Sequence, residues 1–318
     1  MKKPDQFRIS ARELLPLSAR RNLPGILHAV GHLGAIAIVG TALLHSIGSW
    51  WAVPLTFLQG YLIAFLFTAE HEMAHHTAFK TRAFSHVVGH ISGFAIMLPY
   101  EYYRVFHWDH HRHTNDPAND PELARPLPTS LPRLAWFLTG IPTWIDRLRM
   151  LVTHGIHRRV TKRWVPEDKR GLIAREALFY LVGYAAIAGI SIAMQSLAAV
   201  WFWLIPVMVG QWFLRPYLLS EHTGCAHTSN MLENTRTTYT NRFVRFFAWN
   251  MPYHVEHHAY PAVPFHALPQ LNKILAAHIV NAEDGYPAST AAVVSHVAAN
   301  IRNARSAATA TAAKTDIA

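Results

Sequence analysis

The chain has 318 residues, of which 51% are hydrophobic and 15% are charged, against about 25% charged residues in soluble globular proteins. This composition favours an integral membrane protein, and the net charge of +10 then fits Lys and Arg gathered in cytoplasmic loops. The single cysteine, Cys225, excludes an intrachain disulfide framework, an iron–sulfur cluster and a four-cysteine zinc site.

Four apolar segments predict about four transmembrane helices, since a crossing needs about 20 residues. Two very short links join them as two hairpins: residues 23–47 with 51–69, and residues 178–194 with 197–214. A further apolar segment, residues 84–100, is short for a crossing, so we interpret it as interfacial or re-entrant. Residues 101–173 are polar and charged, with an amphipathic part around 131–151, and should form a cytosolic section against the membrane.

The charges give this topology an orientation. None of the 29 Lys and Arg residues lies in the two links, so the positive-inside rule places the links outside and both chain ends in the cytoplasm. We therefore predict an all-α integral membrane protein with a cytosolic helical cap: a tail at 1–22, a membrane domain at 23–288 and a disordered Ala/Ser/Thr-rich tail at 289–318. The Ala- and Arg-rich composition favours a bacterial inner membrane.

Three histidine clusters follow or lie between these segments, each with the spacing of one helix face. Their members are His71 and His75; His107, His110 and His111; and His254, His257 and His258. Eight imidazoles exceed the three or four ligands of one tetrahedral zinc and suit two metal ions with open positions. Imidazole binds Fe, Cu, Zn and Ni, so ligand type alone does not choose the metal.

Other residues near the clusters are also candidate ligands or orienting groups. His222 follows the fourth apolar segment, at the same side of the membrane as the clusters, and is a further candidate ligand. His76 and His113 point away from the faces set by their neighbours and are weaker candidates. The acidic residues inside the clusters are Glu72, Asp109 and Glu256. They either orient ligating histidines from behind, or are solvated or form helix ion pairs.

Two other functions compete at this point. His71-Glu72-x-x-His75 matches the H-E-x-x-H pattern of zinc metalloproteases, in which the Glu is the base. That reading predicts that the clusters at 107 and 254 are dispensable. A non-catalytic metal carrier predicts instead that the ligands lie within the membrane helices rather than just past their ends.

The clusters resemble the three histidine boxes of membrane-bound fatty-acid desaturases and hydroxylases. Flanking sequence agrees, including Asn115-Asp116-Pro117, Asp120-Pro121-Glu122-Leu123 and Tyr253-His254-x-Glu256-His257-His258-x-Tyr260-Pro261. Ser220-Glu221-His222 is similar to the extra motif of the sphingolipid-desaturase-like branch. In the stearoyl-type branch an Asn one turn earlier helps to hold a metal-bound water, and here Leu218 takes that place. The resemblance spans residues 50–275.

This resemblance implies a non-haem di-iron centre, held by the nine histidines, that uses O₂ to attack an unactivated C–H bond in a lipid acyl chain. Desaturation is the more frequent outcome in the family, and hydroxylation of a lipid, carotenoid or small amphipathic substrate is the alternative. Electrons must come from a separate ferredoxin or cytochrome-type donor with its reductase. We expect no nucleic acid. A basic section offers a docking surface for an acidic donor: Arg147, Arg149, Arg158, Arg159, Lys162 and Arg163.

Overall fold

The computed structural model describes residues 7–128 and 130–315, with side chains up to residue 303. In chain order the helical elements are α1 (Ala11–Leu17), α2 (Asn22–His45), α3 (Ala52–Ala64), α4 (Leu66–His75), α5 (Arg82–Ala95), α6 (Tyr100–His113), η1 (Pro121–Ala124), α7 (Leu131–Leu138), α8 (Ile141–Gly155), α9 (Glu167–Ala193), η2 (Val200–Leu204), α10 (Ile205–Val209), α11 (Gln211–His222), α12 (Met231–Asn234), α13 (Arg242–Phe247), α14 (His254–Ala259), η3 (Phe265–Ala267), α15 (Leu268–Leu275), η4 (Ala276–His278) and α16 (Tyr286–Thr315).

The all-α prediction is confirmed except for one short sheet. Strands β1 (Arg236–Tyr239) and β2 (Asn281–Asp284) pair in parallel, with Arg236 opposite Asn281. This sheet brings the segment that follows α12 beside the segment that precedes α16. It therefore closes the cap around α14, which carries the third histidine cluster.

Three helical segments within the described residues are long and apolar enough to cross a membrane. They are α2, the run formed by α3 and α4 (Ala52–His75), and α9. Three of the four predicted crossings are thereby present as single segments. The second one continues beyond its apolar part to His71 and His75, as the sequence predicted.

The fourth predicted crossing, residues 197–214, is divided into η2, α10 and α11. The π-helical turn η2 precedes α10, and Gly210 separates α10 from α11. Gly210 lies so close to α3 that a Cβ placed on it would be 2.2 Å from the carbonyl oxygen of Gly60. This close contact between the backbones of Gly60 and Gly210 holds α10 against α3. It offers a physical reason for the break at Gly210, which hydropathy alone does not predict.

Helix α5 fits the interfacial interpretation of residues 84–100. Its 14 residues span about 21 Å at 1.5 Å per residue, less than the roughly 30 Å of a hydrocarbon core. Phe84, Val87 and Ile91 are exposed along one face, while Gly89 packs against the ring of Tyr100 on the other.

The C-terminal segment differs from its prediction. We expected disorder from residue 289, but α16 begins at Tyr286 and is helical through Thr315. Val293, Val297 and Ile301 are buried at four-residue intervals and pack against Leu134 and Leu219. The Ala-rich composition that suggested disorder also has a high helix propensity, and the apolar stripe gives the helix a surface to pack on.

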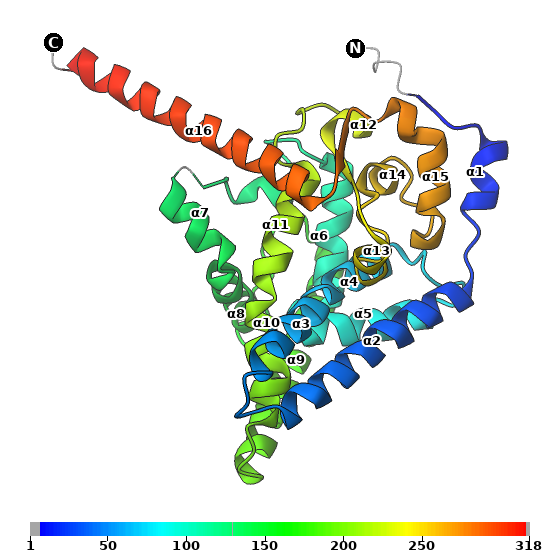
Figure 1. Ribbon diagram of the computed structural model, residues 1–318, viewed down its shortest axis with the longest axis vertical. Helices are drawn as coiled ribbons and strands as arrows, with labels where there is room; N and C mark the ends of the chain where they lie inside the picture. Colours follow the sequence, from blue (N-terminus) through cyan, green and yellow to red (C-terminus); the bar gives the residue numbers. More distant parts are fainter. Residues whose placement is uncertain (1–6, 129, 316–318) are drawn as a thin grey trace.

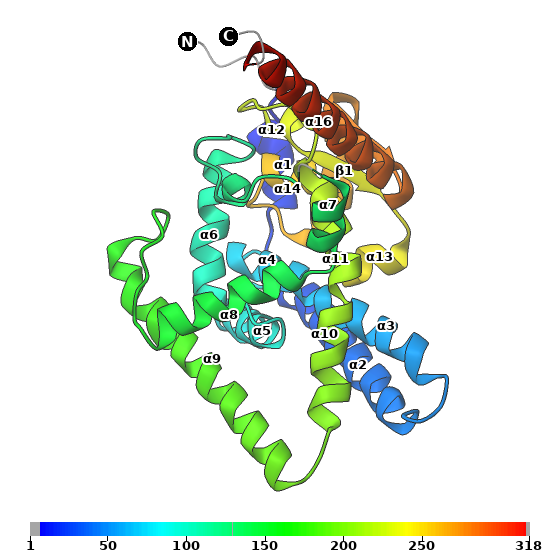
Figure 2. The same cartoon turned by 90° about the vertical axis from the view of Figure 1, so that its left-hand side faces the viewer.

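The chain ends lie opposite the two short links. Figures 1 and 2 show the α2–α3 and α9–η2 links at the lower end of the molecule, and both termini at the upper end with α12, α14 and α15. The N-terminal segment is folded rather than loose, because the backbone N–H of Ile9 donates to the hydroxyl of Tyr260 at 2.8 Å and Ser10 caps α1.

Candidate metal centre

The first histidine cluster lies at the end of α4, a helix in which all ten residues are buried. His71 and His75 are one turn apart, so both rings project from the same face. The helix ends at His76, whose φ of 54° is in the left-handed region. This change of direction turns His76 away, and its ring lies 4.9 Å from that of His86 instead.

The other histidines come from three further elements. His107, His110 and His111 lie on α6, and His254, His257 and His258 lie on the short helix α14. His222 is the last residue of α11. Tertiary packing brings all nine predicted residues together, although they are up to 187 positions apart in sequence.

Five of the nine form one group, which we call the five-histidine group: His71, His75, His107, His111 and His257. Their ligand atoms all lie within 4.8 Å of one another, and all five residues are buried. The Nε2 atoms of His75 and His107 are 2.7 Å apart, those of His107 and His111 are 3.0 Å apart, and those of His111 and His257 are 3.1 Å apart.

The remaining four form the four-histidine group: His110, His222, His254 and His258. The ligand atoms of His110, His222 and His258 lie within 4.8 Å of one another, and Nε2 of His254 is 3.1 Å from Nε2 of His222. The rings of His111 and His258 stack at 4.1 Å, so the two groups are neighbours. This division suits two adjacent metal ions.

The chemistry of the five-histidine group fits a cation. A ring nitrogen carries one hydrogen or one lone pair, so His107 and His111 cannot each bond the two nitrogens that they meet. Burial first, and the neighbouring imidazoles second, hold the pKa of His107, His111 and His257 well below the usual histidine value. The rings are therefore neutral near pH 7, which is the form that binds metal.

In the four-histidine group, His110 has a carboxylate behind it. Its Nδ1 lies 2.9 Å and 3.0 Å from the two oxygens of Asp120. Asp120 is itself held by the backbone N–H groups of Asn115 and Glu122. Burial alone lowers the pKa of His110, but Glu122 and Asp120 outweigh it and the pKa is raised. A carboxylate on Nδ1 directs Nε2 toward the group and makes it a stronger donor to a metal.

Two other members of the four-histidine group also have a hydrogen-bond partner behind the ring. His222 Nδ1 is 3.2 Å from the carbonyl oxygen of Asn234, and His258 Nδ1 is 3.1 Å from Oγ1 of Thr114. His254 Nδ1 is 3.5 Å from Glu221. Sequence reasoning did not single out Asp120, Asn234 or Thr114 for this role, although Asp120 belongs to one of the matching flanking motifs.

The acidic residues inside the clusters do not orient the histidines. Glu72 accepts from the Thr77 hydroxyl at 2.6 Å and from the backbone N–H of Phe265 at 3.2 Å. Glu256 accepts from Thr237 at 2.6 Å, and Asp109 accepts from Arg112 at 3.0 Å. Neighbouring residues on a helix point in different directions, so a residue between two inward-facing histidines points outward. These carboxylates therefore bond to the surrounding structure instead of to the histidines.

This geometry contradicts the zinc-protease alternative. Glu72 would be the base in that mechanism, yet both of its bonded partners lie away from the histidines. His107 and His257 are as close to His75 as His71 is. The weaker candidate His113 lies outside both groups, 3.9 Å from Asp109.

The proposed docking section needs one correction. Arg147 is buried, and its guanidinium donates to the carbonyl oxygen of Ile96. It is therefore unavailable to a partner. Arg163 donates to the carbonyl oxygens of Ala118 and Asn119 at 3.0 and 2.8 Å, but it remains exposed, as do Arg158 and Arg159.

Three membrane-length apolar segments and nine convergent histidines define an integral-membrane protein with a histidine-rich candidate metal site. Residues 48–289 match the family model for fatty acid desaturases. The chain belongs to this family.

Three curated relatives give the resemblance more detail. The chain is 24% identical over 200 residues to the sn-1 oleoyl-lipid 12-desaturase of Picosynechococcus sp., covering 60% of this chain and 56% of that one. It is 23% identical over 253 residues to the sn-1 oleoyl-lipid 12-desaturase of Synechocystis sp. (74% and 71%), and 27% identical over 247 residues to the dihydrorhizobitoxine desaturase of Bradyrhizobium elkanii (71% and 68%). The first match thus spans little more than half of its relative, and the sphingolipid-like branch stays a prediction.

Proposed function

We propose that this protein is an O₂-dependent desaturase that introduces a double bond into the acyl chain of a membrane lipid. The observation that carries the proposal is the convergence of nine buried or half-buried histidines into two adjacent groups. Membership of the desaturase family supports the same reaction.

The two groups have the donors for two iron ions. The five-histidine group would hold one ion and the four-histidine group the other, with Asp120 fixing the ring of His110. Two irons would supply the activation of O₂ that removal of two hydrogens from an unactivated carbon chain requires. These two hydrogens, with two electrons from the donor and two protons, would reduce O₂ to two molecules of water. The chain's own part is to orient the imidazoles and to exclude water. The buried rings of Phe67 and Tyr103, which lie beside His71 and His107, serve the second purpose.

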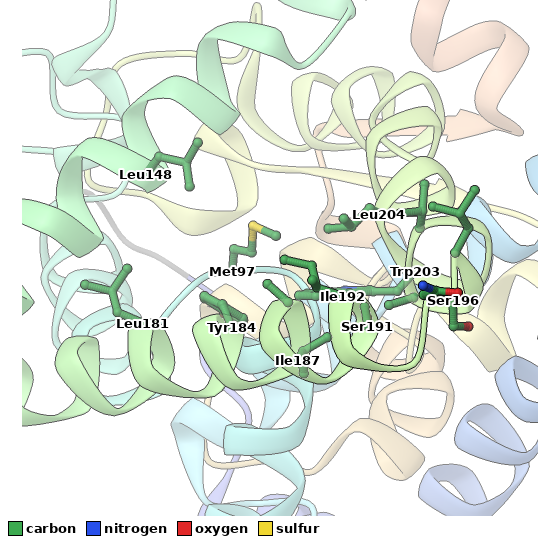
Figure 3. Close-up of a pocket in the computed structure, with 15 residues that line it drawn as sticks. Met97, Leu148, Leu181, Tyr184, Ile187, Ser191, Ile192, Ser196, Trp203 and Leu204 are labelled. Carbon is green, nitrogen blue, oxygen red and sulfur yellow. The ribbon is translucent and has the colours of Figure 1, made fainter.

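An apolar pocket supports a lipid substrate. It has a volume of about 680 Å³ and lies between α9 and the η2–α10 segment. Figure 3 shows side chains from Met97, Leu148, Tyr184, Ile187 and Trp203 around it. A pocket lined almost entirely by carbon, with one wall on the membrane-length helix α9, suits an acyl chain better than a polar substrate.

Electrons would come from a ferredoxin or cytochrome-type donor. Trp108 is 40% exposed, and its ring lies edge-on to that of His75 at 4.9 Å. It borders a small groove that also contains Arg104, Arg112 and Lys169. This groove is the part of the surface where an acidic donor would come nearest to the five-histidine group.

The test is a reconstituted reaction with purified protein, a ferredoxin and its reductase, and an oleoyl lipid in detergent or vesicles. We expect two irons per chain and O₂-dependent formation of a dienoic acyl chain, measured by metal analysis and gas chromatography. An alcohol product would move the protein to the hydroxylase alternative. A single zinc ion, or turnover without O₂, would refute the proposal.

A second experiment addresses the substrate. One relative is named for a small molecule, dihydrorhizobitoxine, rather than for an acyl lipid. Acyl profiles of a strain with and without the gene should differ in double-bond content. Identical profiles, together with two bound irons, would indicate a non-lipid substrate for the same centre.

A further inference from the structure

A second group of histidines and glutamates lies where α5, α6 and α9 meet, outside the nine-histidine site. His86 and His90 are one turn apart on α5, Glu101 is in the first turn of α6, and Glu176 is on α9. The ligand atoms of His86, His90 and Glu101 all lie within 4.8 Å of one another. Neither the desaturase reaction nor the three boxes use these residues.

The two carboxylates are buried with little cationic compensation. The side chains of Glu101 and Glu176 are 8% and 5% exposed. Arg104 donates from Nε and Nη2 to Oε2 of Glu101, at 3.1 and 3.0 Å, and leaves Oε1 free of that contact. The cation that pairs with Glu101 is Arg104, and Glu176 meets the imidazole of His90. Buried carboxylates are costly unless cations or hydrogen bonds compensate them.

The two histidines face these two carboxylates. His86 Nδ1 is 3.5 Å from Oε1 of Glu101, and His90 Nδ1 is 3.1 Å from Oε1 of Glu176. Neither pair is aligned as a hydrogen bond. Glu176 instead accepts the backbone N–H of Glu101 through both of its oxygens, each at 3.0 Å. Imidazole nitrogens and carboxylate oxygens that converge in this way are arranged as ligands of a common cation.

We propose that His86, His90 and Glu101 bind a divalent zinc ion, with Glu176 next to it as a fourth ligand or an orienting group. Two imidazoles and a carboxylate, with one open position, are an established ligand set for zinc. The side chains of His86 and His90 are each 42% exposed, so the ion has a route of entry from solvent. The ion would add to the positive charge that Arg104 already brings to the two buried carboxylates.

This zinc site would fasten α6, which carries the second box, to α5 and α9, next to the end of α4. Glu101 begins α6, which continues to His107, His110 and His111. The ring of His76, at the end of α4, lies 4.9 Å from that of His86. Because metal bound only by the folded state stabilises that state, the ion would hold α5 against α6 and α9 and so limit the movement of the second box.

The proposal can be tested on the purified, iron-loaded protein in detergent. Zinc is added in excess and removed by desalting, and zinc and iron are then counted in the same samples. We expect one additional zinc per chain in the wild type and a higher Tm with zinc. The double variant His86→Asn/His90→Asn should lose both effects and keep its iron. The control His157→Asn replaces an exposed histidine elsewhere and should behave as the wild type.

A second variant covers the case in which the double variant does not fold. Glu101→Gln keeps the size of the side chain and removes the ligand charge, so its zinc should fall while its iron stays constant. Cobalt(II) in place of zinc should give the visible absorption of a four-coordinate site in the wild type alone. No additional zinc in the wild type, or equal zinc in wild type and variants, would overturn the proposal. Because iron is counted separately, this result does not depend on the proposed desaturase activity.

Discussion

The two histidine groups are alike in composition and differ in what positions their rings. In the four-histidine group three of the four rings have a hydrogen-bond partner behind them: a carboxylate for His110, a carbonyl for His222 and a hydroxyl for His258. Nδ1 of His254 meets none among the described residues. In the five-histidine group the Nδ1 atoms of His71, His75, His107 and His257 meet no hydrogen-bond partner among the described residues. These rings are positioned by packing instead, for example by Tyr103, which stacks on His107 at 5.4 Å.

This difference teaches that one site can be built by two physical means. Hydrogen bonds fix both the direction and the tautomer of a ring, whereas packing fixes its position through the volume around it. The two groups should therefore respond to different substitutions. Substitutions at each group, and in the apolar pocket, should have effects of decreasing size.

The largest effect should follow loss of a ligand itself. His258→Ala should abolish product formation and reduce iron to at most one per chain, because no neighbouring side chain can replace the imidazole. The loss of metal affinity should exceed the roughly 10–100-fold that loss of an outer partner costs. Metal analysis and gas chromatography of the lipid product measure the two effects. His157→Ala serves as control, and a fully active His258→Ala protein would mean that the four-histidine group holds no catalytic metal.

Removing a partner from behind a ring should weaken the four-histidine group alone. Asp120→Asn keeps the volume of the side chain but removes the negative charge beside Nδ1 of His110. The affinity for the metal should therefore fall about 10–100-fold. Mössbauer spectra, which distinguish two iron environments, should show preferential loss of one iron. Asp168→Asn removes a surface carboxylate that pairs with Lys169 and should change nothing. Equal loss of both irons would show that the groups are not held independently.

Removing packing volume should weaken the five-histidine group instead. Tyr103→Leu leaves space beside His107 and should lower the free energy of unfolding by about 2 kcal/mol, with a visible fall in Tm. Tyr103→Phe should have little effect, because the Tyr103 hydroxyl meets no hydrogen-bond partner among the described residues. Similar Tm losses in both variants would mean that the hydroxyl, rather than the ring, matters.

The smallest effect should come from the apolar pocket, which lies on α9 away from the histidines. Ala188→Phe fills part of the pocket and should change the preferred acyl chain length by a few-fold without loss of iron. Ala186→Phe adds the same volume at a position that does not line the pocket. Competition between lipids of different chain length, measured by product ratios, reports the change. The same ratios in both variants would place the substrate chain elsewhere.

Local sequence patterns predicted which histidines converge, because the spacing within each cluster is a local property. The spacing of His107, His110 and His111 already defines a helix face, and α6 supplies that helix. The apolar lengths likewise predicted α2 and α9. Hydropathy could not predict the division of residues 197–214, because the break at Gly210 depends on close contact with Gly60, 150 positions earlier. Composition also predicted disorder where α16 is helical, since the packing partners of this helix lie on α7 and α11.

By itself, then, the sequence determined the membrane class, the helical fold, the three boxes and nine histidines that meet in one place. Only the tertiary structure decided how those nine divide into groups of five and four, and which groups stand behind them. It also brought His86 and His90 to Glu101 and Glu176. The physical reason is that the direction of a side chain along one helix follows from the period of that helix. The partner it meets follows from packing between segments far apart in the chain.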